Sequence, residues 1–239
     1  MPSSPTFTAT IEKIVERTPD TRSFFLRVGN GQKLSFLPGQ FLSFLLPVGG
    51  ETLTRAYTIA SLPGEEECFE ICLNQVDGGP GSSYLFSRKE ADVLCFTGPW
   101  GNFVLDQPTD AEYIFIADRV GVVPFRPMIA RLLTAGGHHT ARLLYAAPQA
   151  GDLLYAAEWQ RWEGRCASFS FRPLIAECEP EEYAIEKGLL PYVEQHFVKE
   201  VRQYSRRFYI CGIGRPVLLL RDLLRGAGYE RQVVKYEKW

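Results

Sequence analysis

The hydrophobic pattern of the chain changes near residue 106, and this change limits the possible folds more than any other feature. From residue 6 to about 105, short runs such as TRSFFLRV and FEICLNQV alternate apolar and polar residues, and turns such as LPGQ and PVGG separate them. Alternation over a few residues is typical of half-buried strands. The first half is therefore expected to form an antiparallel barrel or sandwich.

The second half follows the polar connector DQPTD and alternates apolar strand-like runs with helical patterns. YIFIA precedes VPFRPMIARLL, ARLLYAA precedes AAEWQRW, SFSFRPL precedes KGLLPYVEQHF, and RRFYICG precedes RPVLLLRDLLRGAG. Repeated strand-then-helix units predict a parallel sheet with helices on its faces. We therefore expect two domains, an antiparallel β-barrel at residues 1–107 and an α/β parallel-sheet domain at residues 108–239.

Bulk properties exclude several classes of protein. The chain has 239 residues, 46% of them hydrophobic, and a formal net charge of -2. A near-neutral chain without a long basic block is not expected to bind nucleic acid or an anionic membrane. No apolar run approaches the ~20 residues of a bilayer helix, and the start lacks the pattern of a secretory signal, so we expect a cytoplasmic protein without membrane insertion. The six cysteines form no C-x-x-C pair, and no metal site is expected.

The stretch RAYTIAS at residues 55–61 has an unusual composition for a strand. Side chains two apart on a strand share a face, so Arg55, Tyr57 and Ile59 lie on one face and Ala56, Thr58 and Ala60 on the other. A cation, an aromatic ring and a hydroxyl on one short strand suit an extended ligand with an anionic part and a flat ring. An amphipathic edge strand with a surface arginine and a half-buried tyrosine is the alternative interpretation.

The stretch DGGPGSSYLFSRK at residues 77–89 predicts a short helix behind a serine N-cap. Glycines directly before the helix would leave backbone N–H groups free at its N-terminus. Such groups attract phosphates, because they donate hydrogen bonds and lie at the positive end of the helix dipole.

The order of motifs resembles that of the ferredoxin-NADP reductase superfamily over nearly the whole chain. These motifs are R-x-Y-T, G-x-x-S-x-x-L, G-P-x-G-x-F, a glycine-bearing loop that ends in P-F, C-G, and a terminal E-x-aromatic. The resemblance implies an FAD-binding β-barrel domain and an NAD(P)-binding α/β domain. The FAD-binding branch of the family fits better than the FMN-binding branch, although FMN stays possible.

The resemblance also assigns roles to residues. Arg55 would bind the flavin pyrophosphate, Tyr57 would lie against the flavin ring, and Thr58 would bond the ring nitrogen that receives hydride. Cys211 would lie near the reacting nicotinamide carbon, Glu237 would help position that ring, and Trp239 would cover the other flavin face. The implied catalytic residues are Thr58, Cys211 and Glu237, and the implied cofactor-binding residues are Arg55, Ala56, Tyr57, Thr58, Gly79, Gly81, Ser82, Ser83, Trp239, Arg119, Gly121, Pro124 and Gly212.

The loop ADRVGVVPF departs from the family pattern. Relatives carry two glycines and a threonine where this chain has Asp118, Arg119 and Val120. A glycine there lets the backbone approach the dinucleotide, whereas a carboxylate would repel a pyrophosphate. Arg119 could offset that repulsion, or pair with Asp118 and fill the site. The sequence therefore predicts flavin binding more strongly than nicotinamide binding.

We expect an FAD-dependent NAD(P)H oxidoreductase that passes electrons to a separate carrier, such as a ferredoxin, a flavodoxin or an oxygenase component. NADH is weakly favoured over NADPH, because the stretches YAAPQAGD and LIAECEP lack a basic residue for a 2'-phosphate and contain Glu177. Two alternatives stay open. One is a non-catalytic FAD-holding subunit with a degenerate nicotinamide site. The other is a reductase that releases free reduced flavin. The stretch GGPGSS disfavours the second, because it is suited to hold the pyrophosphate and so to retain the dinucleotide.

Overall fold

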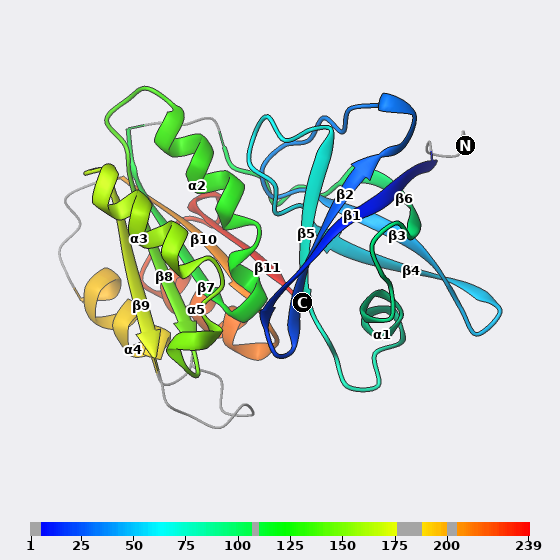
Figure 1. Cartoon of the computed structure of the whole chain (residues 1–239). Coiled ribbons are helices and arrows are strands. Elements are labelled where there is room, and N and C mark those ends of the chain that lie inside the picture. Colours follow the sequence, from blue (N-terminus) through cyan, green and yellow to red (C-terminus); the bar gives the residue numbers. More distant parts are fainter. Residues whose placement is uncertain (1–5, 107–109, 176–187, 200–204) are drawn as a thin grey trace. The chain divides into compact units, whose positions relative to one another are not determined.

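The computed structural model describes residues 6–106, 110–175, 188–199 and 205–239. The chain divides into two compact units, which are described separately (Figure 1). Unit 1 comprises Met1–Leu105 and Arg126–Arg131, and unit 2 comprises Asp106–Phe125 and Leu132–Trp239. The boundary expected between residues 107 and 108 falls outside the described residues and stays a prediction.

Unit 1 contains a six-stranded antiparallel sheet in the order β4-β3-β6-β1-β2-β5. Directly after β4, Ile59 forms an antiparallel bridge with Ile71 of β5, so the two edges of the sheet meet and the barrel closes. The predicted antiparallel barrel is thereby confirmed. Its strands are β1 (Thr6–Thr18), β2 (Thr21–Val28), β3 (Phe41–Val48), β4 (Glu51–Thr58), β5 (Cys68–Asn74) and β6 (Val93–Trp100).

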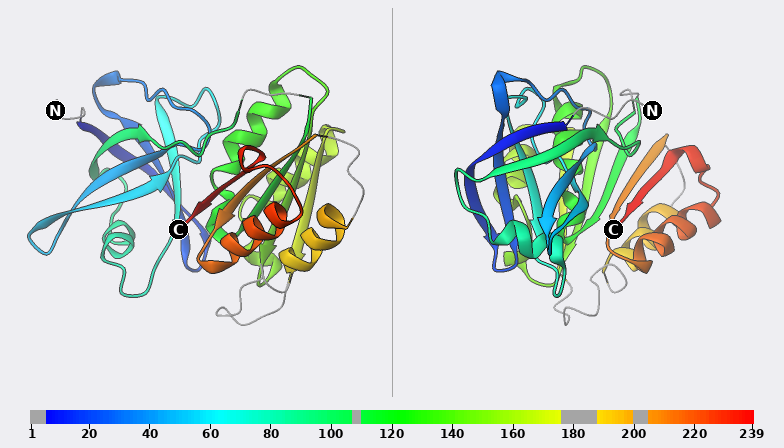
Figure 2. Two further views of the ribbon diagram at one scale, coloured as in Figure 1. Left: turned by 180° about the vertical axis from the view of Figure 1, so that it is seen from behind. Right: turned by 90° about the vertical axis from the view of Figure 1, so that its right-hand side faces the viewer.

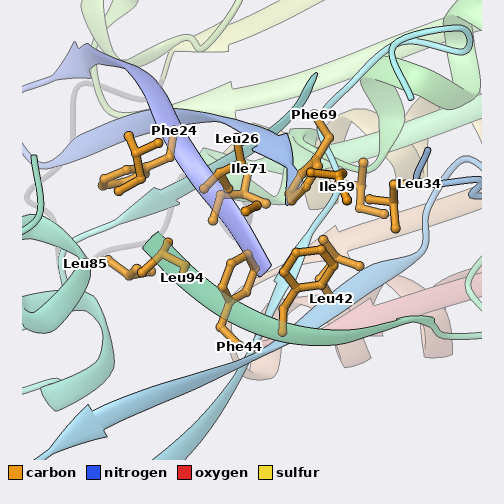
Figure 3. Packing of buried hydrophobic residues seen from close by; sticks show 14 of the residues in the cluster. Phe24, Leu26, Leu34, Leu42, Phe44, Ile59, Phe69, Ile71, Leu85 and Leu94 are labelled. Carbon is orange, nitrogen blue, oxygen red and sulfur yellow. The ribbon is translucent and has the colours of Figure 1, made fainter. Parts of the chain in front are cut away.

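The interior of the barrel is apolar because alternate residues of its strands point inward. Phe24 and Leu26 of β2 lie two residues apart and are both fully buried, as are Leu42 and Phe44 of β3. Figure 3 shows these four side chains meeting Ile71 and Leu94 in one cluster. Burial of such side chains contributes about 1.5–3 kcal/mol each, which makes the barrel a rigid support for residues at its rim.

A single helix, α1 (Pro80–Phe86), lies between β5 and β6. The sequence pattern predicts a serine N-cap, but the N-cap residue is Gly79 and the helix begins at Pro80. Proline suits the first helical position because it lacks an N–H and has a helical φ. Leu85 of this helix is fully buried in the barrel core, which fixes the helix on the barrel.

Unit 2 contains a five-stranded sheet in the order β11-β10-β7-β8-β9, and all its pairs are parallel. The predicted α/β domain is thereby confirmed. Its strands are β7 (Glu112–Asp118), β8 (Thr140–Ala147), β9 (Phe169–Ile175), β10 (Arg206–Gly212) and β11 (Val234–Lys238). The strand pattern YIFIA is buried at every position, as expected for a central strand covered on both faces.

Helices follow the strands of unit 2. They are α2 (Phe125–Thr134), of which Arg126–Arg131 belong to unit 1, α3 (Ala156–Arg165), α4 (Leu190–Val193), which continues as a π-helical turn over Glu194–Val198, and α5 (Arg215–Gly226). Figure 2 shows α4 and α5 over the face of the sheet opposite α3. Leu220 and Leu224 of α5 pack there against Phe208 and Ile210 of β10. No helix in the described part of the chain is long and apolar enough to cross a membrane.

Candidate functional site

Arg55 and Tyr57 of β4 lie beside the first turn of α1. A Cβ atom built on Gly81 would lie 2.7 Å from Arg55 Cγ and 3.3 Å from the Tyr57 hydroxyl. Only glycine therefore allows the helix to approach the strand this closely. The Arg55 side chain is exposed, and its Nη1 donates a hydrogen bond to the Thr54 carbonyl over 2.8 Å. The guanidinium is thus held next to the start of α1 and stays accessible to a ligand.

The hydroxyl groups of Tyr57 and Thr58 lie in different surroundings. Tyr57 packs edge-on to Phe44, with ring centroids 5.8 Å apart, and burial raises the pKa of its hydroxyl to about 12, so it is neutral. Thr58 is 4% exposed, and its Oγ1 has no hydrogen-bond partner among the described residues. A buried polar atom without a partner costs about 1–3 kcal/mol. A ligand atom that bonds Thr58 would remove this cost.

The turn before α1 is held by its own polar groups. The hydroxyl of Ser82 accepts a hydrogen bond from Val76 N over 3.0 Å and donates to the Gly79 carbonyl over 3.1 Å. Ser83 is exposed, and its N–H donates to the same carbonyl over 3.0 Å. Ser82 therefore shapes the turn, while Ser83 and exposed Ala56 of β4 lie on the surface of unit 1.

In unit 2, three predicted site residues meet where β10 and β11 end. Cys211 of β10 pairs with Glu237 of β11, and Trp239 Nε1 donates a hydrogen bond to Cys211 Sγ over 3.1 Å. Trp239 N also donates to the Gly212 carbonyl over 3.0 Å. Burial raises the pKa of Cys211 well above its ordinary range, so the thiol is neutral. The chain terminus is thus held in place, and the indole is 41% exposed.

Glu237 is the acid of this group. Burial raises its pKa to about 7, and its Oε2 has no hydrogen-bond partner in the part of the chain that the structure describes. A carboxyl group with a pKa near 7 can both hold and release a proton at neutral pH. Cys211, Glu237 and Trp239 therefore form a group with a neutral thiol, a titratable acid and an aromatic ring.

The loop after β7 keeps the backbone shape of a glycine loop without most of its glycines. Arg119 has a φ of +45°, a region that side chains other than glycine adopt at a cost. Its carbonyl accepts a hydrogen bond from the Tyr145 hydroxyl over 2.9 Å, and that hydroxyl accepts one from Leu154 N over 3.0 Å. Tyr145 therefore links the loops that follow β7 and β8.

Gly121 has a structural reason to be glycine. A Cβ atom on it would collide with the carbonyl oxygen of Cys211 and would lie 2.8 Å from Gly212 Cα. The family resemblance implies that this glycine lies against a bound dinucleotide, but its close neighbour in the structure is the chain's own backbone. Pro124 is buried and directly precedes α2.

Asp118 is buried at the C-terminal end of β7. Its side chain is only 1% exposed, and its Oδ1 accepts a hydrogen bond from Ile213 N over 3.2 Å. Burial raises its pKa to about 7, with the hydrogen bond from Ile213 N and the charge of Arg119 opposing the shift. The carboxyl group lies against Gly212, where a Cβ atom would collide with Oδ1. Position 118 is therefore filled by an internal contact.

Comparison with known proteins decides the family. One family model, the oxidoreductase FAD-binding domain, matches residues 8–105, and another, the oxidoreductase NAD-binding domain, matches residues 115–218. The chain belongs to the ferredoxin-NADP reductase superfamily. It is an oxidoreductase, and its cofactors are FAD and a nicotinamide dinucleotide.

Individual relatives cover most of the chain. Ferredoxin--NADP reductase B of Sorangium cellulosum is 28% identical over 98% of this chain and 97% of its own length. The electron transfer component of toluate 1,2-dioxygenase of Pseudomonas putida is 27% identical over 98% of this chain and 67% of its own length. The structure of a Neisseria gonorrhoeae ferredoxin NADP+ reductase with bound FAD and NADP shares the fold, with a TM-score of 0.80, 18% identity and 98% coverage of both chains.

The residues on β4 and α1 fit a bound FAD. The unpartnered Thr58 hydroxyl can bond a ring nitrogen, the exposed Arg55 guanidinium can pair with a diphosphate, and Gly81 adds no side chain beside Arg55 and Tyr57. The role of each residue stays a prediction.

Sequence reasoning did not identify Tyr145 as part of the site. The only signal in the sequence was a hydroxyl-bearing residue at the end of an otherwise apolar strand, LLYAA. Glu177, on which part of the expected preference for NADH rested, lies outside the described residues.

Proposed function

We propose that this chain oxidises NADH or NADPH at unit 2 and delivers the electrons, one at a time, to a separate redox protein. FAD connects the two-electron oxidation of the nicotinamide with the delivery of single electrons, because a flavin accepts a hydride and can give up single electrons. The observation that carries the proposal is the group of Cys211, Glu237 and Trp239 at the C-terminal edge of a parallel sheet. Ligands bind at that edge in open α/β sheets.

In this proposal the FAD diphosphate is bound by Arg55 and by the first turn of α1. The forked guanidinium of arginine matches a diphosphate better than an ammonium does. Gly79, Gly81, Ser82 and Ser83 supply a tight turn without bulky side chains, and the fixed Ser82 hydroxyl keeps its shape. Tyr57 offers a neutral ring for stacking against the flavin. The small side chain of Ala56 leaves room for a ligand beside the strand.

The reacting nicotinamide would be positioned by unit 2. A neutral Cys211 thiol contacts the ring without placing a negative charge beside it. Glu237 can donate a hydrogen bond in its protonated form and accept one in its ionised form. Trp239 supplies a partly exposed aromatic ring at the same edge of the sheet. Arg119, Gly121, Pro124 and Gly212 would line the dinucleotide site.

The electron acceptor is proposed to be a ferredoxin, a flavodoxin or an oxygenase component. The Sorangium relative is named for ferredoxin, and the Pseudomonas relative is named as an electron transfer component of a dioxygenase. We also propose that the protein acts in the cytoplasm, where reduced nicotinamides are generated.

NADH is proposed as the preferred donor. The loop after β8 is held by Asp152, whose carboxylate accepts a hydrogen bond from Gln149 N over 3.1 Å. The stretch Pro148–Asp152 contains no lysine or arginine. An acidic loop without a cation would repel a 2'-phosphate and tolerate a free ribose hydroxyl.

The test is anaerobic mixing of the FAD-loaded protein with NADH or NADPH, followed by oxidised ferredoxin or flavodoxin. We expect loss of the visible flavin absorbance with NADH faster than with NADPH, and its return in step with reduction of the acceptor. A flavin that neither nucleotide reduces would contradict the proposal.

A second candidate function is that of an FAD-holding electron-transfer subunit without nicotinamide oxidation. Asp118 favours it, because a buried carboxyl group occupies the end of β7. In that case electrons from a partner protein would reduce the flavin and NADH would not. NAD+ affinity before and after replacement of Asp118 and Arg119 by glycine separates the two, since a degenerate site has almost no affinity in the unmodified protein and a working site binds already.

A further inference from the structure

The turn between β10 and α5 has the features of an anion-binding element. Helix α5 has 12 residues, and its N-cap is Gly214, with a φ of +72°. Backbone N–H groups at a helix start have no partner within the helix, and the helix dipole adds positive potential there. The turn also lies where β10 ends, at the edge of the sheet where ligands of this fold class bind.

This turn already contacts a carboxyl group of its own chain. Asp118 Oδ1 accepts a hydrogen bond from Ile213 N over 3.2 Å and lies against Gly212. The other oxygen, Oδ2, is buried and has no hydrogen-bond partner among the residues described. Asp118 is only 1% exposed, and one of its two carboxyl oxygens is hydrogen-bonded. It is therefore part of the protein interior beside this turn and not a surface acid.

The backbone around Asp118 holds the carboxyl group in this position. Asp118 is the last residue of β7 and pairs with Ala146 of β8. The next residue, Arg119, is fixed in the left-handed region by the bond from the Tyr145 hydroxyl to its carbonyl. The carboxyl group can therefore leave Ile213 N only by a change of its own side-chain rotamer, and protonation removes its charge without moving it.

We propose that Asp118 is an internal competitor for the dinucleotide, because its carboxylate occupies the anion-binding β10–α5 turn and a dinucleotide diphosphate binds there only with uptake of a proton by Asp118. The inference rests on the proposed function, since it concerns the same dinucleotide site. Asp118 thus sets the affinity of the protein for the dinucleotide and the dependence of that affinity on pH. It takes no part in hydride transfer.

The charged and titratable groups around Asp118 set the direction of the effect. Arg119 on the following turn favours the carboxylate, Cys211 on β10 is neutral, and Glu237 on β11 pairs with Cys211. Burial nevertheless dominates and raises the pKa of Asp118 to about 7. Below that pH the competitor is neutral, and above it each pH unit weakens binding by about tenfold, so that affinity falls roughly 100-fold between pH 6 and pH 9.

The experiment is isothermal titration of FAD-loaded protein with NAD+, which binds without reducing the flavin. Titrations run from about pH 6 to about pH 9, in pairs of buffers with different heats of ionisation, so that proton uptake is measured directly. We expect uptake of close to one proton at about pH 8 by the unmodified protein. Asp118→Asn and Asp118→Gly should take up none and should bind NAD+ roughly 10-fold or more tightly at about pH 8.

Two further variants identify the titrating group. Asp222→Asn removes an exposed carboxylate of α5 that pairs with Arg221, and it should keep the pH dependence of the unmodified protein. Glu237→Gln removes the other acid with a pKa near 7, which the proposed function places beside the nicotinamide. Its affinity for NAD+ is expected to differ from that of the unmodified protein, but the proton uptake assigned to Asp118 should remain. Thermal unfolding of each variant confirms that it is folded.

Several outcomes would overturn the inference. These are affinity that does not change with pH, pH dependence that survives in Asp118→Asn, pH dependence that disappears in Glu237→Gln, and absence of NAD+ binding at every pH in all variants. The readout does not depend on flavin reduction. A chain that binds NAD+ with this pH dependence but is not reduced by NADH would retain the inference and refute the proposed function.

Discussion

The two candidate cofactor regions are built in opposite ways. In unit 1, one strand and the helix beside it present an exposed cation, a half-buried ring and a partnerless hydroxyl, namely Arg55, Tyr57 and Thr58. In unit 2, three neighbouring parallel strands contribute Asp118, Cys211 and Glu237, all of them with pKa values raised by burial. The first region exposes its charged group, whereas the second buries its ionisable groups within the chain.

The difference shows what glycine does in each region. Gly81 in unit 1 makes room for the side chains of Arg55 and Tyr57, whereas Gly121 in unit 2 makes room for the carbonyl of Cys211. Loss of the first glycine would disturb mobile side chains, and loss of the second would disturb the backbone. The flavin region should therefore respond to mutation mainly through binding, and the nicotinamide region mainly through stability and proton linkage.

The largest expected effect comes from Gly121→Ala. The new methyl group would collide with the Cys211 carbonyl, which two strands of the sheet hold in place. We expect a loss of roughly 3 kcal/mol or more in the free energy of unfolding, measured by chemical denaturation without nucleotide. Gly151→Ala is the matched control, because a Cβ atom there meets nothing within 4 Å. Equal stability of the two variants would show that Gly121 is kept for a ligand.

The next largest effect concerns Asp118→Asn. Asp118 has a pKa of about 7 in the folded protein and an ordinary value of 3.8, so the folded state retains a proton that the unfolded state loses as pH rises between these values. This destabilisation grows from about pH 4 to about pH 7 and is constant above that range. The amide removes it, and we expect a gain of roughly 2 to 4 kcal/mol in unfolding free energy at about pH 8.

The measurement is a series of denaturation curves for both proteins across this pH range. Near pH 4 the gain should vanish. A gain that is independent of pH, or a loss at about pH 8, would contradict the burial of a titrating carboxyl group at this position.

In unit 1, Arg55→Ala should weaken FAD binding while leaving the apoprotein as stable as before. Hydrogen bonds to charged groups contribute about 1.5–3 kcal/mol, which corresponds to a roughly 10- to 100-fold rise in the dissociation constant for FAD. Fluorescence titration of apoprotein with FAD measures it. Arg27→Ala removes another exposed arginine of the barrel, one that pairs with Glu12, and should leave FAD affinity unchanged.

The smallest expected effect comes from Thr58→Val, which keeps the shape and removes the partnerless hydroxyl. We expect apoprotein that is about 1 kcal/mol more stable and an FAD-bound form that gains less, because the flavin then loses a hydrogen bond. Thermal unfolding with and without FAD gives both values. An apoprotein destabilised by the substitution would mean that Thr58 is already satisfied within unit 1.

Much of the fold could be predicted because its signals are local. Alternation in TRSFFLRV and the strand-then-helix order after residue 110 depend on neighbours in the chain, and the barrel and the parallel sheet are both present. The N-cap of α1 was placed on a serine, whereas Gly79 and Pro80 define the start of the helix. Pro80 has a helical φ and lacks only an N–H that the helix start leaves unpaired, so the local rule for proline outweighed the preference for serine.

The site could be predicted only in part. The face shared by Arg55 and Tyr57 follows from strand geometry, and their contact with Gly81 bears it out. The surroundings of Asp118 could not be predicted, because Gly212 and Ile213 reach it from the end of β10, which is distant in sequence. Burial of a carboxyl group depends on such packing, and no pattern near residue 118 indicates it.

The most direct test of the account is the reduction of FAD by NADH within this chain alone. Anaerobic stopped-flow mixing of the FAD-loaded protein with NADH, and with NADH carrying deuterium at the transferred position, measures the loss of flavin absorbance. The account predicts complete reduction, slower with the deuterated nucleotide because the carbon–hydrogen bond breaks in that step. A flavin that stays oxidised with NADH and NADPH, yet is reduced by a redox partner protein, would contradict it.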